Sequence, residues 1–79
     1  MLFRSDTNYK DQILRHFQQK YQQTPTYKQI SVDGPPHNRI FTMAIYDIND
    51  NKLGLGKGKS KKKAEQNASK VALQKLGVI

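Results

Sequence analysis

Apolar side chains near the start of the chain recur every fourth residue, at Tyr9, Ile13, Phe17 and Tyr21. At about 100° per residue, this spacing places all of them on one face of an α-helix. The pattern stops at Thr24-Pro25, because proline disfavours helical backbone in the residue before it. The sequence therefore predicts an amphipathic helix over residues 8 to 22, after a flexible lead-in over residues 1 to 7.

The next part of the chain favours extended structure. Residues 27 to 32 are rich in β-branched and aromatic side chains and end at an Asp-Gly-Pro-Pro segment. Residues 40 to 48 follow the two-residue period of a strand with one buried face. The apolar positions of this period are Phe41, Met43 and Ile45. These patterns predict two strands.

A third strand is expected after Asn49-Asp50-Asn51, since these residue types tolerate the left-handed backbone of tight turns. Residues 51 to about 56 should return antiparallel to the second strand and close a hairpin. In this arrangement we expect Leu53 and Leu55 to face inward.

A second helix is predicted after the glycines at positions 54, 56 and 58, because apolar side chains there again recur on one helical face and form a stripe. This stripe consists of Ala64, Ala68, Val71, Ala72 and Leu76, with Leu73 at its edge. Gly77 supplies a C-terminal stop, and the small alanines would let this helix lie close to the sheet or to the first helix. The resulting order is α-β-β-β-α, an α+β fold with a three-stranded antiparallel sheet and both helices packed on one face. Residues 8 to 79 form its single domain.

The charge balance is strongly basic, with 14 Lys and Arg against 6 acidic residues and a formal net charge of +8. This charge favours a polyanionic partner, with nucleic acid as the leading candidate and an anionic membrane as the rival. A peripheral membrane module would need a helix with an apolar face left for lipid. Both predicted stripes are needed for the core, so the sequence favours nucleic acid and no membrane.

The chain has no cysteine, which excludes a disulfide framework and a thiolate zinc site, and no metal or cofactor is indicated. The apolar start is too short for a signal peptide, and no run of about eighteen apolar residues could span a bilayer. The acidic residues are scattered, whereas a two-metal phosphodiesterase needs clustered carboxylates. We therefore expect a soluble, cytoplasmic module without catalytic activity of its own.

The most informative stretch is residues 54 to 63, which leads into the second helix. Ser60 is a good N-cap, so the lysines at positions 61 to 63 fill the first turn, where the helix dipole disfavours cations. An external phosphate would reverse this penalty. A solvated lysine cluster is the alternative. A nucleotide-binding P-loop is disfavoured, because its first glycine would have to stand at Leu53.

Two further surfaces are candidates for recognition. The loop Gly34-Pro-Pro-His-Asn-Arg39 is stiffened by its prolines and could present His37 and Asn38 to a hydroxyl or carbonyl group. The first helix carries a strip of mainly polar residues opposite its apolar stripe. This strip consists of Asp11, Leu14, Arg15, Gln18 and Gln22. Taken singly, each surface could also be ordinary solvated exterior.

Together these features resemble the double-stranded-RNA-binding domain over residues 8 to 78. The segments Tyr27-Lys-Gln-Ile-Ser-Val-Asp-Gly-Pro-Pro-His37 and Gly56-Lys-Gly-Lys-Ser-Lys-Lys-Lys-Ala-Glu-Gln-Asn-Ala68 are most similar to the version at the C-terminus of ribonuclease III enzymes. In such domains the first helix enters one minor groove, the loop enters the next, and the lysines straddle the major groove between them. The resemblance implies double-stranded RNA as partner, bound by shape and by phosphate and 2′-hydroxyl contacts.

The resemblance also implies which residues touch the RNA. The minor-groove contacts fall on Asp11, Arg15, Gln18, Pro36, His37 and Asn38. The phosphate contacts fall on Lys57, Lys59, Ser60, Lys61 and Lys62. The first helix departs from the family pattern, with Asp11, Leu14 and Arg15 where a Thr and a Gln-Glu pair usually stand. We therefore expect weaker sequence discrimination, with affinity less affected.

The resemblance leaves the parent protein open. In a ribonuclease III, this chain would be the substrate-binding domain, and the catalytic domain and any dimer contact would lie outside these 79 residues. A stand-alone protein that sequesters double-stranded RNA is an alternative. A protein-interaction or dimerisation module of the same fold is another, although such versions tend to lose the lysines and the loop histidine.

Overall fold

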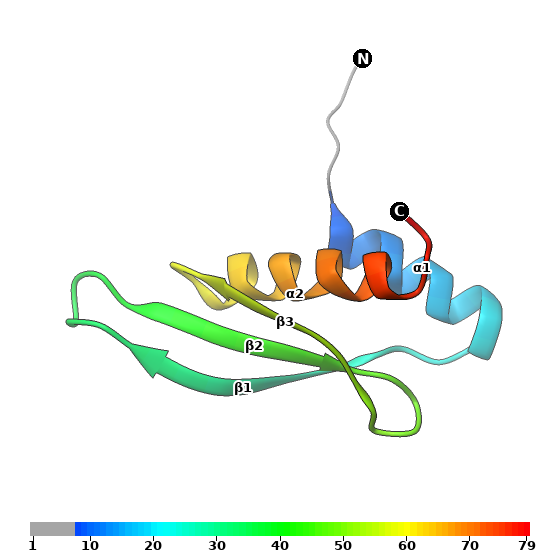
Figure 1. Ribbon diagram of the computed structural model, residues 1–79, viewed down its shortest axis with the longest axis horizontal. Helices are drawn as coiled ribbons and strands as arrows, with labels where there is room; N and C mark the ends of the chain where they lie inside the picture. The colour runs from blue at the N-terminus through cyan, green and yellow to red at the C-terminus, as the bar shows by residue number, and fades with distance from the viewer. Residues whose placement is uncertain (1–7) are drawn as a thin grey trace, which may run out of the picture.

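A computed structural model describes residues 8–79, and both helices lie on the same side of a three-stranded sheet (Figure 1). The elements in chain order are α1 (Tyr9–Tyr21), β1 (Thr26–Asp33), β2 (Ile40–Tyr46), β3 (Lys52–Gly58) and α2 (Lys61–Lys75). The sheet order is β1-β2-β3, with both strand pairs antiparallel. The predicted α+β order is confirmed, and the predicted lead-in over residues 1 to 7 lies outside the described residues.

The ends of the helices follow from local backbone and side-chain requirements. The Asn8 side chain accepts a hydrogen bond from the Asp11 N–H and so caps the start of α1. Gln22 closes that helix in the left-handed conformation, with φ 58°. Gly77, with φ 77°, follows the end of α2 as the sequence predicts.

Asp47 organises the turn between β2 and β3. Its carboxylate accepts hydrogen bonds from the backbone N–H groups of Asn49 at 2.8 Å and Asn51 at 2.9 Å. These bonds, with that of Asn51 the strongest influence, hold the pKa of the Asp47 carboxyl below its ordinary value. Asp50 takes the left-handed conformation, with φ 65°. The predicted turn is confirmed, but β2 ends at Tyr46 because the turn already begins at Asp47.

A β-bulge in β3 changes which side chains face the core. Between the partners of Ile45 and Tyr46, β3 contains an extra residue, Leu53, which pairs with neither. Leu53 is buried, at 8% exposure, whereas Leu55 is 41% exposed. The prediction that both leucines face inward is wrong for Leu55, because the extra residue shifts the two-residue alternation of the strand.

The face of β3 that α2 covers is lined by glycines. A β-carbon added to Gly56 would overlap the backbone of Ala68 and lie 2.5 Å from the carbonyl oxygen of Ala64. At Gly54 and Gly58, an added β-carbon would also come within 2.8 Å of backbone atoms of α2. The facing alanines of α2 are fully buried. The small alanines therefore do let this helix lie close to the sheet, and the glycines of β3 are required for the same contact.

The core lies between the sheet, α2 and the inner face of α1. Its buried members are Ile13, Phe17, Ile45, Leu53, Ala68, Ala72 and Leu73. The predicted stripe on α2 is wrong for Val71, which is 40% exposed, while Leu73 and Ser69 are fully buried. The reason is that α2 packs against both β3 and α1. The buried face of the helix therefore includes the side that contacts α1 and leaves Val71 outside.

We expect Gly56→Ala to destabilise the fold by about 2–3 kcal/mol, because α2 would have to move off β3 to admit the new methyl group. Gly77→Ala is the matched control: its φ is also unfavourable for alanine, but the space around it is open, so the cost should be about 1 kcal/mol. Urea unfolding monitored by circular dichroism measures both. Equal losses would show that the contact between α2 and β3 does not limit stability.

Candidate nucleic-acid interface

The start of α2 concentrates positive charge. Ser60 has extended backbone and accepts a hydrogen bond from the Lys63 N–H at 3.1 Å, which fixes the first turn. Lys61 and Lys62 are exposed in this turn, which contains no acidic residue. The N–H groups at the helix start and the helix dipole add to the positive potential. This turn is suited to an external anion, to which the Ser60 hydroxyl can also donate a hydrogen bond.

The loop between β1 and β2 is a stiff projection. The Asn38 N–H donates to the Pro35 carbonyl at 2.9 Å, which closes a turn with Pro36 and His37 at its tip. Gly34 enters the loop with φ 93°, and a β-carbon there would lie 2.5 Å from the Asn38 carbonyl oxygen. The side chains of residues 36 to 38 are all exposed. The loop therefore presents His37 to solvent from a constrained backbone.

The outer face of α1 carries the third set of predicted residues. Arg15 Nε lies 3.2 Å from Asp11 Oδ2, one helical turn away. The Arg15 side chain is 76% exposed, so this ion pair is weak and its guanidinium can exchange partners at little cost. Gln18 and Leu14 are exposed on the same helix.

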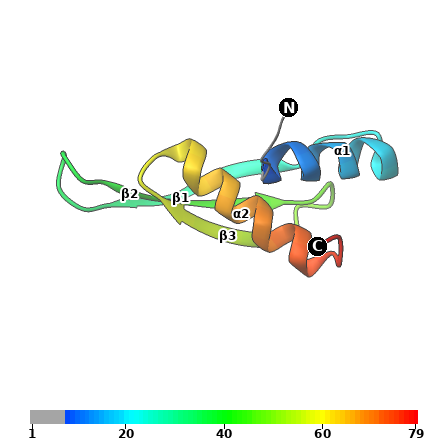
Figure 2. The same ribbon diagram turned by 90° about the horizontal axis from the view of Figure 1, so that it is seen from above.

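The fold brings these three surfaces into succession along the molecule. Val32 pairs with Phe41, and Phe41 pairs with Gly58, so the β1–β2 loop lies at the end of the sheet where β3 passes into α2. Helix α1 begins beside the second turn of α2, where the Lys10 N–H donates to Gln66 Oε1 at 3.0 Å. Figure 2 shows the order from one end of the molecule: the loop, the start of α2, then α1.

Lys57 is separated from the lysines of α2. Because Gly56 and Gly58 face α2, the alternation of β3 turns the intervening Lys57 to the opposite face of the sheet, across from Thr42. Its carbonyl accepts a hydrogen bond from the Asn67 side chain at 2.5 Å, which ties the end of β3 to α2. Lysines that are close in the sequence therefore lie on two faces of the molecule.

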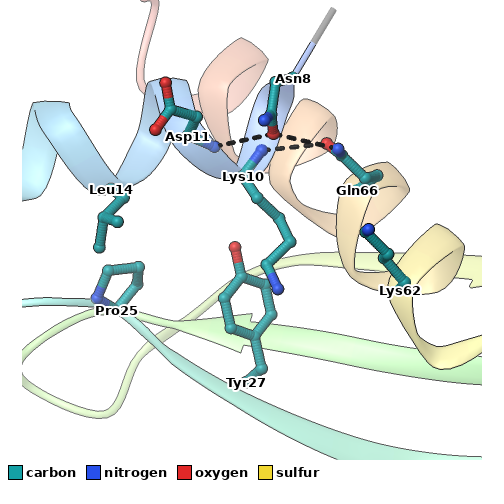
Figure 3. Close-up of a pocket in the computed structure, with 8 residues that line it drawn as sticks. All are labelled: Asn8, Lys10, Asp11, Leu14, Pro25, Tyr27, Lys62 and Gln66. Atoms are coloured by element: carbon teal, nitrogen blue, oxygen red, sulfur yellow. Dashed lines mark hydrogen bonds between the residues drawn. The ribbon is translucent and has the colours of Figure 1, made fainter.

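A pocket of about 290 Å³ opens between α1 and the start of α2 (Figure 3). Its apolar wall is formed by Leu14, Pro25 and Tyr27, and its polar rim includes Asp11 and Lys62. The Tyr27 hydroxyl makes a hydrogen bond of 2.5 Å with the Ser69 hydroxyl, and burial raises the pKa of the Tyr27 phenol. No sequence pattern indicated this pocket, because its walls come from three segments that only the tertiary fold brings together.

The aromatic side chains do not form an open stacking surface. Tyr46 of β2 is half-buried, and Lys28 Nζ lies 4.6 Å from the centre of its ring. Tyr9, Phe17 and Tyr21 belong to the core or pack against it, as predicted. An array of bare rings of the kind that stacks single-stranded bases is thus not present on the described residues.

Residues 8–79 contain neither a metal-ligand cluster nor a membrane-spanning helix. In this range, no group of three or more Asp, Glu or His side chains is placed to hold a metal ion. None of the helices in the same range has the length and apolar character needed to cross a membrane.

The chain is similar to proteins of one family. Residues 9–76 match the family model described as double-stranded RNA binding motif. A probable ribonuclease 3 of Acanthamoeba polyphaga mimivirus is 46% identical over 70 residues, which cover 89% of this chain and 13% of the viral protein. Ribonuclease 3 of Dehalococcoides mccartyi is 42% identical over 72 residues, 91% of this chain and 30% of the bacterial protein. Ribonuclease 3 of Protochlamydia amoebophila is 41% identical over 69 residues, which cover 87% of this chain and 28% of that protein. The chain thus spans less than a third of the length of each of these relatives.

Proposed function

Because this chain belongs to the double-stranded RNA binding motif family, we propose that it binds double-stranded RNA by shape, through contacts to phosphates and ribose 2′-hydroxyls. The observation that carries this proposal is the succession of three exposed surfaces along the molecule: the β1–β2 loop, the first turn of α2, and α1. A-form RNA offers a wide, shallow minor groove lined by 2′-hydroxyls, and about 16 base pairs present two such grooves with a major groove between them. Three surfaces in succession could contact a minor groove, the major groove and the next minor groove in that order.

The residues divide by the part of the duplex that they would contact. Arg15, Gln18 and Asp11 of α1 would enter one minor groove, and Pro36, His37 and Asn38 of the loop would enter the next. Lys59, Ser60, Lys61 and Lys62 would contact phosphates across the major groove. Apart from the half-buried Asp11 and Ser60, these side chains are exposed, and the first turn of α2 has no acidic residue; both observations support this division. Lys57, on the other face of β3, would make at most a peripheral phosphate contact.

We further propose that the chain is the substrate-binding domain of a ribonuclease III-like RNA-processing endonuclease in the cytoplasm. The names of its relatives and their much greater length support this parentage. In that protein, cleavage and dimerisation belong to a nuclease domain outside these residues. The chain alone should therefore leave bound RNA intact in the presence of Mg²⁺, which a denaturing gel of labelled duplex would test.

We expect the chain to bind an RNA duplex of about 16 base pairs at least roughly tenfold more tightly than the DNA duplex of the same sequence. The reason is that B-form DNA lacks the 2′-hydroxyls and has a different groove spacing. Fluorescence anisotropy at one fixed salt concentration measures both affinities. Equal affinity for the two duplexes would reduce the protein to a general polycation.

His37→Ala should weaken RNA binding roughly five- to tenfold, the value of a hydrogen bond or two to the duplex, and leave the melting temperature unchanged. The residue is exposed at the tip of the loop, so its removal opens no cavity. Calorimetry and anisotropy on the same variant provide the comparison. A sharp fall in melting temperature with unchanged affinity would make His37 a structural residue.

Lys61→Glu combined with Lys62→Glu should abolish RNA binding while the free domain becomes as stable or slightly more stable, by a few tenths of a kcal/mol per site. Negative charge is favourable at the start of a helix but repels phosphate. The matched control, Lys70→Glu with Lys75→Glu, changes the net charge equally on the same helix. It should lower affinity modestly and stability slightly, since Lys75 lies in the last turn. Similar RNA affinities for the two double variants would refute the assigned phosphate site.

A further inference from the structure

One side chain of α2 is bonded to the very start of α1. The Lys10 N–H donates to Gln66 Oε1 at 3.0 Å, and Gln66 Nε2 donates to Asn8 Oδ1 at 3.1 Å. Asn8 Oδ1 also accepts the capping bond from the Asp11 N–H at 3.2 Å. A single amide thus bonds both to a backbone N–H of the first turn of α1 and to its capping residue (Figure 3).

These bonds join segments that lie 56 and 58 residues apart in the sequence. They are accompanied by an ion pair from the same turns, in which Lys10 Nζ lies 2.6 Å from Glu65 Oε1. Among the described elements, α2 is the one that α1 packs against most extensively. The buried side chains of Ile13 and Phe17 hold α1 against the core, and the directional hydrogen bonds at its first turn fix where the helix begins. The position of the start of α1 therefore depends on this polar contact together with the core.

Gln66 follows Lys62 by four residues, so the two side chains lie on the same face of α2, about 6 Å apart along the axis. Both line the pocket between the helices. The residue that anchors α1 is therefore one helical turn from a lysine of the proposed phosphate site. The single helical turn between Gln66 and Lys62 therefore sets the distance from the α1 surface to the proposed phosphate site.

We infer that Gln66 is a positioning residue for duplex RNA: by fixing the start of α1, it keeps the α1 surface at the distance from Lys62 that the A-form grooves require. The inference rests on the proposed function. It assigns to Gln66 no contact with RNA. Loosening α1 should cost contacts to 2′-hydroxyls in the minor groove, while the phosphate contacts of α2 remain.

This inference predicts a particular pattern for Gln66→Ala. RNA affinity and the ratio of RNA affinity to DNA affinity should both fall, by roughly tenfold, since two hydrogen bonds that hold α1 are lost. The dependence of log affinity on log salt should keep its slope, because that slope counts phosphate contacts. The RNA-to-DNA affinity ratio of Gln66→Glu, which retains an acceptor for the Lys10 N–H but not the donor to Asn8, should lie between those of the alanine variant and the unmodified chain. Its added negative charge should weaken binding of both duplexes and so leave this ratio unaffected.

Variants of Asn8 separate positioning from simple helix capping. Asn8→Asp keeps an acceptor for both the Asp11 N–H and Gln66 Nε2, so the RNA-to-DNA ratio should stay at the value of the unmodified chain. Asn8→Ala should reproduce the fall in ratio. Gln74→Ala, an exposed change near the other end of α2, serves as the control for the mutation of a glutamine on this helix.

Different results would contradict the proposed RNA binding and the positioning role of Gln66. If the unmodified chain showed no preference for RNA over DNA, the proposed function itself would be wrong. If that preference were present but unchanged in Gln66→Ala, with only the melting temperature lowered, Gln66 would be a structural cap and the inference would be overturned. A reduced salt slope in Gln66→Ala would also overturn it, because the loss would then lie in the phosphate contacts.

Discussion

The close approach of α2 to β3 is the constraint on which the rest of this domain depends. Gly54, Gly56 and Gly58 leave no side chain between the strand and the helix, and an added β-carbon at any of them would meet the helix backbone. With α2 so near the sheet, alanine side chains are large enough to fill the interface. The start of α2 is thereby held at the end of the sheet from which the β1–β2 loop projects.

The start of α2 is electrostatically unfavourable, and this packing holds it in place. Three lysines follow the Ser60 cap, and the helix dipole opposes them. The penalty is tolerable because the position of the turn is decided by buried contacts of Ala64 and Ala68 against β3, together with the Ser60 cap. The buried face of α2 thus supplies stability, and its exposed first turn presents the lysines that we propose for phosphate contacts.

The predictable part of the structure is the part that sequence periodicity specifies. The stripe of α1 and the turn at residues 49 to 51 predicted the elements correctly, because burial of one face and turn chemistry are local requirements. Leu55 and Val71 were misassigned because a bulge and a neighbouring helix shift the buried face, and neither leaves a local signal. The candidate site residues were chosen from the sequence by residue type and remain predictions, whereas the separation of Lys57 from the other lysines depends on strand alternation.

Helix α2 also explains how an exposed recognition surface can be rigid without being buried. Different parts of this helix have separate roles. One side packs on β3, another contacts α1 through Gln66 and the core, and the first turn presents lysines to solvent. A rigid helix transmits position over its length because its backbone hydrogen bonds are internal. Two surfaces attached to the same helix therefore keep a fixed spacing even though their own side chains move freely. Recognition by shape needs fixed spacing more than fixed side chains, and attachment of α1 and the lysines to one helix meets that need.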